Sequence, residues 1–282
     1  MVYEGLFQTF YENGMVREES YYKDGKLEGT SRSFYPNGKI MEENTYLNNI
    51  KEGPSRTFYE NGSIKSEVCF KNEKVSGLAK YYFDDGELKA EITYSNGKKN
   101  GPAKIFYRSG PLRENKTHID DKIEGLVSTY YKSGVIKGEW SYKNGVPEGV
   151  SKFYYETGEI MGEKSYKEGK DHGLTQIFFK DGKLKEKITF EEGKRHGINL
   201  VFDISGEIKK ELIYEKGVMK TKINESPESL IKEEVNELIN EEISALKPHQ
   251  SKNEKIVKGV FIVTIVFFVT FLLYTLLITF AG

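Results

Sequence analysis

Histidine and cysteine, which often serve as catalytic residues and metal ligands, are scarce in this sequence, with four histidines and one cysteine. His172 and His196 are the best candidates for metal ligands, because they occupy the same position in two successive copies of a 24-residue repeat. Equivalent positions in neighbouring hairpins are expected two strands apart, about 10 Å, whereas zinc–nitrogen bonds are about 2.0–2.1 Å long. No third ligand is evident, so both histidines are interpreted as ordinary turn residues.

The motifs of the common catalytic groups are also missing. The sequence contains no glycine-rich phosphate loop, no Ser/His/Asp arrangement and no His-Glu-x-x-His motif. Cys69 lies between Val68 and Phe70 in an expected strand, which favours a packing role over a nucleophilic one. A single cysteine cannot form an intramolecular disulfide and favours a reducing compartment. We therefore predict a protein that is not an enzyme and has no catalytic residue, cofactor or metal site.

A glycine recurs at a spacing of 24 residues and defines nine units without insertion or deletion. These glycines are Gly5, Gly29, Gly53, Gly77, Gly101, Gly125, Gly149, Gly173 and Gly197. Each unit contains a pair of aromatic residues, an Asn-Gly-like turn and a second segment of alternating character, which is typical of a β-hairpin. A second turn, such as Lys23-Asp24-Gly25, leads to the next unit. Asn49 and Asp121 stand where this turn usually has glycine, and both residue types tolerate the left-handed conformation. Glu73 stands at the same position and predicts strain or a different turn, because glutamate tolerates that conformation less well.

Alternation in the second strand predicts which residues share a face of the sheet. An apolar column (Val16, Ile40, Ile64, Leu88, Leu112, Ile136, Ile160, Leu184, Ile208) is followed one residue later by a mostly basic one and three residues later by a mostly acidic one. Strict alternation places the basic and acidic columns together on the face opposite the apolar column. These charges are interpreted as solvent-exposed ion pairs that contribute about a few tenths of a kcal/mol each to the stability of the fold.

The two aromatic residues of each unit are expected on opposite faces. The first (Phe10 and its equivalents) joins the apolar column as core if the loop Glu12-Asn13-Gly14 has three residues, which sets Phe10 opposite Val16. A two-residue turn would exchange the columns. The second aromatic column then forms a partly exposed stripe that could bind another protein or simply pack one unit on the next. The predicted protein-binding residues are Tyr35, Tyr59, Phe83, Tyr107, Tyr131, Tyr155 and Phe179.

These features predict an all-β repeat fold for residues 1–220, an elongated single antiparallel sheet of nine stacked hairpins. Eighteen strands at a spacing of about 4.8 Å would make a ribbon on the order of 85 Å long. Each unit contacts mainly its neighbours, and no deep pocket is expected. The first strand is expected to be an uncapped edge that invites pairing.

The repeat ends at Lys220, and the composition then changes. Residues 226–246 are predicted as an acidic amphipathic helix, either a cap on the last hairpin or a partner helix. Residues 247–258 form a basic polar linker. Residues 259–280 contain no charged residue and would span about 33 Å as a helix, enough to cross a bilayer core of about 30 Å. Because the lysines precede this span, the positive-inside rule places the repeats in the cytoplasm.

Charge narrows the classes of partner. Lys plus Arg (42) nearly balance Asp plus Glu (43), and the repeats alone are close to neutral. Nucleic-acid binding would need a concentrated basic surface and is therefore not expected. Lipid-headgroup binding by the repeats is weakly disfavoured for the same reason, although the basic linker could contact anionic lipids.

The units resemble the bacterial variant of MORN repeats, through their aromatic pair, N/D-G turn, Lys-x-Glu strand and K-x-G-x-x-x-G link. The resemblance covers roughly three quarters of the chain and includes YwqK-type antitoxin proteins. It implies an elongated sheet of hairpins that binds proteins, in antitoxins a cognate toxin. The fifth unit departs furthest, with Asn115, His118 and Asp121 in place of the usual acid, aromatic and glycine.

The sequence thus predicts a membrane-anchored, non-enzymatic scaffold that binds another protein, with a toxin or a membrane-associated protein as the partner. An alternative is membrane tethering or lipid association by the repeats, and self-association is a further expectation. The chain would be a single-pass protein of the bacterial inner membrane with its repeats facing the cytoplasm.

Overall fold

The computed structural model describes residues 3–223, which contain all nine repeat units. The predicted acidic helix (226–246), basic linker (247–258) and membrane span (259–280) lie outside the described residues. By contacts, the repeats belong to a unit that runs from Met1 to Asn224.

The regular secondary structure of residues 3–223 consists of β-strands. The first strand of each unit is β1 (Gly5–Phe10), β4 (Gly29–Phe34), β6 (Ile50–Phe58), β9 (Gly77–Tyr82), β11 (Lys98–Phe106), β13 (Lys122–Tyr130), β16 (Gly149–Tyr154), β18 (Lys170–Phe178) or β21 (Gly197–Phe202). The second strand is β2 (Val16–Lys23), β5 (Ile40–Leu47), β7 (Ile64–Lys71), β10 (Leu88–Ser95), β12 (Leu112–Ile119), β14 (Ile136–Lys143), β17 (Ile160–Lys167), β19 (Leu184–Glu191) or β22 (Ile208–Glu215). Short link strands are β3 (Lys26–Leu27), β8 (Lys74–Val75), β15 (Val146–Pro147) and β20 (Lys194–Arg195), and β23 (Val218–Ile223) follows the last unit.

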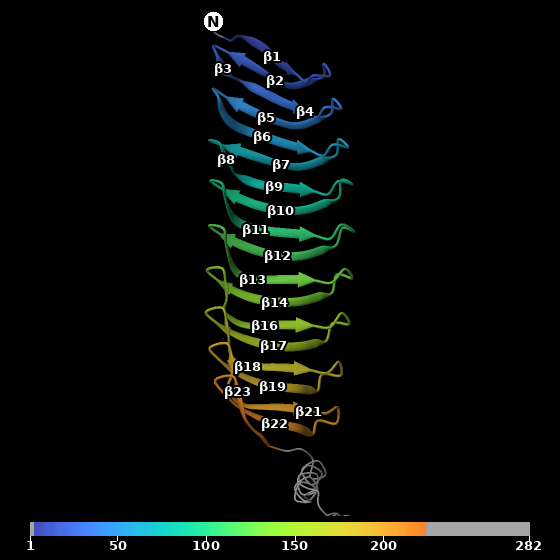
Figure 1. Cartoon of the computed structure of the whole chain (residues 1–282), viewed down its shortest axis with the longest axis vertical. Coiled ribbons are helices and arrows are strands. Elements are labelled where there is room, and N and C mark those ends of the chain that lie inside the picture. The colour runs from blue at the N-terminus through green and yellow to red at the C-terminus, as the bar shows by residue number, and fades with distance from the viewer. Residues whose placement is uncertain (1–2, 224–282) are drawn as a thin grey trace, which may run out of the picture. The chain divides into compact units, whose positions relative to one another are not determined.

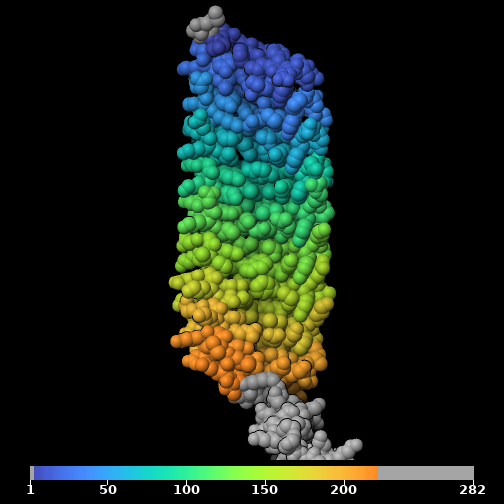
Figure 2. Space-filling view, viewed as in Figure 1, coloured from blue at the N-terminus to red at the C-terminus, as the bar shows by residue number. Residues whose placement is uncertain are grey.

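The strands form one open antiparallel sheet in which sequence neighbours pair (Figure 1). Within a unit the two long strands pair as a hairpin, as β1 with β2, and the second strand then pairs with the first strand of the next unit, as β2 with β4. The space-filling view shows the successive units in contact along the sheet (Figure 2). The predicted all-β antiparallel sheet of stacked hairpins is confirmed for the described residues.

The hairpin loop has the predicted three-residue form. The amide of Tyr11 donates a hydrogen bond of 2.8 Å to the carbonyl of Met15, and Gly14 N donates one of 2.9 Å to the Tyr11 carbonyl. Gly14 has φ +83°, in the left-handed region that a residue without Cβ adopts without strain. The pairing of Phe10 with Val16 is therefore confirmed.

The link turn explains why Asn, Asp and Gly recur between units. Both of its central residues have positive φ, as at Asp24 (50°) and Gly25 (74°), which defines a type I′ turn. The predicted substitutes Asn49 (72°) and Asp121 (68°) adopt the same conformation. Glu73 also adopts it, with φ 63°, so the strain predicted at this residue is present in an otherwise regular turn.

A β-bulge at the start of each second strand changes the predicted faces. Phe10 pairs with Val16 but Thr9 pairs with Glu18, so Arg17 is an extra residue opposite β1. The acidic column consequently lies on the same face as the first aromatic column, as the hydrogen bond from Tyr82 Oη to Glu67 (2.8 Å) demonstrates. The prediction that basic and acidic columns share a face was wrong, because strict alternation does not hold through a bulge.

We call the face with Phe10, Val16, Glu19 and their equivalents the charged face, and the face with Phe7, Tyr11, Tyr22 and their equivalents the aromatic face. No described element covers either of them. The side chains expected as core are therefore only partly covered, and Phe10 is 56% exposed. Most of the buried residues are instead small or medium-sized ones on the aromatic face: Ser55, Ala79, Ala90, Ala103, Val127, Ser151, Thr175 and Asn199.

Candidate protein-binding surface

The second aromatic residue of each unit bonds to the main chain of the next unit. Tyr59 Oη donates a hydrogen bond of 2.9 Å to the carbonyl oxygen of Tyr82, which lies 23 residues further along the chain. The same bond, of 2.6 to 2.9 Å, is made by Tyr11, Tyr35, Tyr107, Tyr131 and Tyr155. Each of these carbonyls faces the preceding unit, so the tyrosine hydroxyls link consecutive hairpins.

The seven residues predicted to bind a partner form one half-buried column on the aromatic face: Tyr35, Tyr59, Phe83, Tyr107, Tyr131, Tyr155 and Phe179. Five of them use their hydroxyl inside the sheet, so only the ring remains for a partner. Phe83 and Phe179 have no hydroxyl. The column thus has a structural role, and its role in binding stays a prediction.

Four lysines of the basic column lie over rings of this aromatic column. Lys65, Lys89, Lys137 and Lys185 place their Nζ atoms 5.6 to 5.7 Å from the ring centroids of Tyr59, Phe83, Tyr131 and Phe179. This distance is within the range of cation–π attraction. We call these four lysines and the seven aromatic residues the aromatic–lysine stripe.

The stripe lysines have no ionic partner among the described residues. All four are exposed, and none forms a salt bridge with a described carboxylate. The bulge causes this isolation, because it turns the acidic column to the other face. Sequence reasoning missed the consequence, since the bulge has no residue signature of its own.

Several cations of the charged face, by contrast, pair with carboxylates of the sheet. Arg32 lies 3.1 Å from Glu19 and 2.7 Å from Glu43. Arg56 lies 3.2 Å from Glu67, and Lys152 lies 3.6 Å from Glu163. The hydrogen bond from Tyr82 and the nearby Arg56 lower the pKa of Glu67, while burial and Glu67 raise the pKa of Tyr82 to about 12.

A shallow apolar depression lies on the aromatic face beside the stripe. It has a volume of about 370 Å³, and its lining includes Phe153, Ile177, Ile188 and Phe190. Gly162 leaves it open, and a Cβ at Gly162 would lie 2.8 Å from the carbonyl oxygen of Gln176. One unit earlier the equivalent Gly138 is covered by Trp140, whose ring packs edge-on against Phe153 at 5.5 Å.

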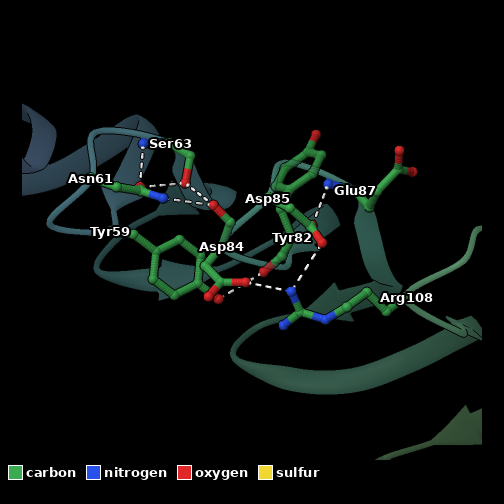
Figure 3. A network of polar contacts seen from close by, with 8 residues as sticks. All are labelled: Tyr59, Asn61, Ser63, Tyr82, Asp84, Asp85, Glu87 and Arg108. Atoms are coloured by element: carbon green, nitrogen blue, oxygen red, sulfur yellow. Dashed lines mark hydrogen bonds and ion pairs between the residues drawn. The ribbon is translucent and has the colours of Figure 1, made fainter.

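The hairpin turns of the third to fifth units are joined by polar contacts (Figure 3). Asn61 Nδ2 and Ser63 Oγ each donate a 2.8 Å hydrogen bond to the carbonyl of Asp84. Arg108 donates to the carboxylates of Asp84 (2.6 Å) and Asp85 (2.9 Å), and it also stacks on Phe83 at 4.7 Å. The hydrogen bond from Arg108 lowers the pKa of Asp84. These contacts hold the turn beside Phe83, where the hydroxyl link is missing.

The residues considered first for chemistry do not come together. Among the described residues no group of three or more His, Cys, Asp or Glu side chains could hold a metal ion. His172 and His196 are half-buried, and each Nδ1 atom has no hydrogen-bond partner there. Cys69 is exposed, so the packing role expected for it was wrong. Its strand pairs it with Pro54 on the uncovered charged face, where nothing described encloses it.

Within residues 3–223 the structure contains no helix long and apolar enough to span a bilayer.

Comparison with known proteins gives one family match. The family described as MORN repeat variant matches seven segments that together make up more than half of the chain: residues 3–24, 27–48, 51–72, 76–96, 123–144, 147–168 and 171–192. No curated protein matches. Among solved structures, a porin-like protein from Bacteroides uniformis is similar over 77% of this chain and 92% of its own, with 8% identity and a TM-score of 0.20. A TM-score this low supports no inference.

Proposed function

We propose that this chain, which belongs to the family of MORN repeat variants, is a non-enzymatic scaffold that binds an acidic surface of another protein. The aromatic–lysine stripe is the contact site. Repeat sheets of this kind are used for unrelated partners, so the proposal rests on the chemistry of the site rather than on the fold.

The unpaired lysines of the stripe carry the proposal. Lys65, Lys89, Lys137 and Lys185 have no ionic partner among the described residues, whereas Arg32, Arg56 and Lys152 on the other face are paired. Partner carboxylates would meet these ammonium groups, and apolar parts of the partner would cover the rings beneath them. Tyrosine is enriched among the residues that dominate interface energies.

The depression at Gly162 supplies the apolar component of the same site. Its lining by Phe153, Ile177, Ile188 and Phe190 suits one aliphatic or aromatic side chain of the partner. Anchors of this kind usually fill pockets near the centre of an interface. The expected partner surface is therefore acidic with at least one exposed apolar residue.

Membrane attachment completes the proposed function. The uncharged residues 259–280 would hold the repeats at a membrane surface, and the preceding lysines orient them toward the cytoplasm. Neutralisation of a toxin by direct binding, as the resemblance to YwqK-type antitoxins implies, is one concrete form of this activity. An acidic toxin surface would be the ligand in that case.

A second candidate function follows from the same lysines. Unpaired ammonium groups attract anionic lipid headgroups at about 1 kcal/mol each, so the stripe would also suit a lipid surface. We favour a protein because half-buried rings and a depression for a single side chain match a protein interface better than a layer of headgroups.

Charge reversal of the stripe tests the proposal. The test variant is the full chain with four lysines changed to Glu: Lys65, Lys89, Lys137 and Lys185. In a pull-down from solubilised membranes, we expect this variant to lose the protein partner that the unchanged chain binds. The matched control changes Lys23, Lys71, Lys143 and Lys167 to Glu, which alters the net charge equally at exposed positions near the link turns. These substitutions spare the tyrosine hydroxyl links, and circular dichroism checks the fold.

Two results would contradict the proposal. If both variants retain the partner equally, the stripe is not the contact site. If the stripe variant keeps the protein partner but no longer binds vesicles of anionic phospholipid, the lipid function replaces the protein function.

A further inference from the structure

The outer edge of β1 is more apolar than an exposed strand edge usually is. Among the described strands β1 pairs only with β2, and its side chains Leu6 and Phe10 are 64% and 56% exposed. Terminal repeats of stacked proteins normally present a polar outer surface, because an apolar strand edge recruits other strands. A strand of this kind is prone to pair with another strand.

The hydrogen-bond pattern identifies the main-chain groups that are available. The carbonyl of Tyr3 and the amide of Tyr11 bond toward β2 and its turns, to Gly25 and Met15. Because main-chain groups alternate in direction along a strand, those of Leu6, Gln8 and Phe10 point away from β2. In the interior of the array, the carbonyl of Phe34, which is equivalent to that of Phe10, accepts the hydroxyl of Tyr11. Within residues 3–223 no unit precedes Phe10 to supply such a donor to its carbonyl.

We propose that β1 pairs with β1 of a second copy of this chain, antiparallel about a two-fold axis at Gln8. Leu6 of each copy then lies opposite Phe10 of the other, and Gln8 lies opposite its own equivalent. This pairing goes beyond the proposed function and does not depend on it.

The side chains of β1 are self-complementary in this register. Leu6, Gln8 and Phe10 alternate onto the charged face, so each exposed leucine covers an exposed phenyl ring of the other copy. Gln8 is neutral, whereas the equivalent residues of the next three units are Arg32, Arg56 and Lys80. Two like charges facing one another on the axis would be repulsive, and two glutamine amides can form hydrogen bonds instead.

Head-to-tail stacking is the competing arrangement, and the last unit argues against it. Asp203 stands where other units have Tyr or Phe, so this unit has no hydroxyl to donate to the Phe10 carbonyl of a following copy. The Asp203 carboxylate instead accepts amide hydrogen bonds from Ser205, Gly206 and Glu207 of its own turn. The outer side of β22 is already paired with β23.

The two-fold axis stands perpendicular to the sheet, which keeps the same face of both copies on the same side. The aromatic–lysine stripes of two copies would therefore face in one direction. A pair of identical sites held together binds a multivalent or two-fold partner more tightly than one site does.

Disulfide trapping tests this geometry in the full chain in detergent, with Cys69 changed to Ser. Residues in a hydrogen-bonded antiparallel pair have Cα atoms about 5.5 Å apart, inside the range of about 4.4–6.8 Å that a disulfide needs. We expect Gln8→Cys to form a disulfide-linked dimer on mild oxidation. Leu6→Cys alone should not, because its own equivalent lies four residues away, about 13 Å along the strand. A mixture of Leu6→Cys and Phe10→Cys chains should form linked dimers.

A charge on the axis provides a second test. Adding Gln8→Lys to the mixed Leu6→Cys and Phe10→Cys chains should reduce the linked dimer at least tenfold. The control Gln176→Lys, at the same repeat position inside the array, should leave the yield unchanged. The proposal is overturned if Gln8→Cys reacts with a maleimide but does not dimerise, or if Gln8→Lys and Gln176→Lys give equal yields.

Discussion

The hydroxyl of Tyr59 donates a 2.9 Å hydrogen bond to the carbonyl oxygen of Tyr82, one hairpin further along the sheet. Five other tyrosines repeat this bond. A single-layer sheet lacks an enclosed core, so its units depend on contacts to neighbouring units more than a globular domain does. The tyrosine column is therefore part of what holds the array together.

Removing one hydroxyl should measure the contribution of this link. We expect Tyr59→Phe to lower the free energy of unfolding by about 0.5–1.5 kcal/mol, because the Tyr82 carbonyl loses its donor. The reverse change Phe179→Tyr should raise stability, since it offers a hydroxyl to the carbonyl of Phe202. Urea unfolding followed by circular dichroism gives both values. Unchanged midpoints in both variants would show that the hydroxyl links do not stabilise the sheet.

The link turn at Glu73 should be a weak point that a single substitution repairs. Glu73 has φ 63°, a conformation that costs a residue with a Cβ about 1–2 kcal/mol. We expect Glu73→Gly to stabilise the protein by about 1 kcal/mol. At the equivalent position, Gly97 (φ 81°), the substitution Gly97→Glu should destabilise by a similar amount. Thermal unfolding of both variants measures the difference, and equal effects of the same sign would contradict this explanation.

His118 should make the stability of the fifth unit depend on pH. Burial, with smaller effects of Lys116 and Lys99, lowers the pKa of His118 below the ordinary value of a histidine, about 6.5. The folded state therefore disfavours the protonated form. The free energy of unfolding is therefore highest above about pH 6.5, where the histidine is neutral in both the folded and the unfolded state. It falls as the pH drops from there toward the lowered pKa, by about 1.4 kcal/mol for each unit between the two pKa values.

The substitution His118→Tyr provides the control, because most units carry Tyr at this position. Urea midpoints of both proteins at pH 7.5 and pH 5.5 should show a larger loss for the unchanged chain on acidification. Equal losses would mean that His118 titrates alike in the folded and unfolded states.

Trp140, the single tryptophan, reports on the aromatic face through Gly138. A Cβ on Gly138 would lie 2.6 Å from Cη2 of Trp140, so Gly138→Ala should displace the ring from Phe153. We expect a red-shifted emission spectrum and a loss of about 1 kcal/mol in stability. Gly162→Ala should cost more, because its Cβ would meet the main-chain oxygen of Gln176 at 2.8 Å. An unchanged emission maximum in Gly138→Ala would contradict this geometry.

The sequence allowed the repeat, the turns and the hairpin register to be predicted. The pairing of Phe10 with Val16 and the left-handed Asn49 and Asp121 follow from local turn chemistry, which a single unit already contains. Which face of the sheet the basic and acidic columns occupy could not be predicted in this way. The bulge at Arg17 depends on how two strands align, and nothing in the residues distinguishes it from regular alternation.

The site was predicted only in part for the same reason. The aromatic column lies on one face as expected, but the separation of its lysines from the acidic column follows from the bulge. The exposure of Cys69 follows from the absence of a described covering layer, which the pattern of a single strand does not reveal.

Site-specific photocrosslinking in living cells tests the central claim most directly. p-Benzoylphenylalanine at Phe179 places the probe in the stripe without removing a hydroxyl link, and the same probe at Lys104 reports on the charged face. We predict a discrete protein adduct from position 179 that disappears when Lys137 and Lys185 are changed to Glu. An adduct of equal yield from position 104, or no protein adduct from position 179, would contradict the claim that the stripe binds a protein.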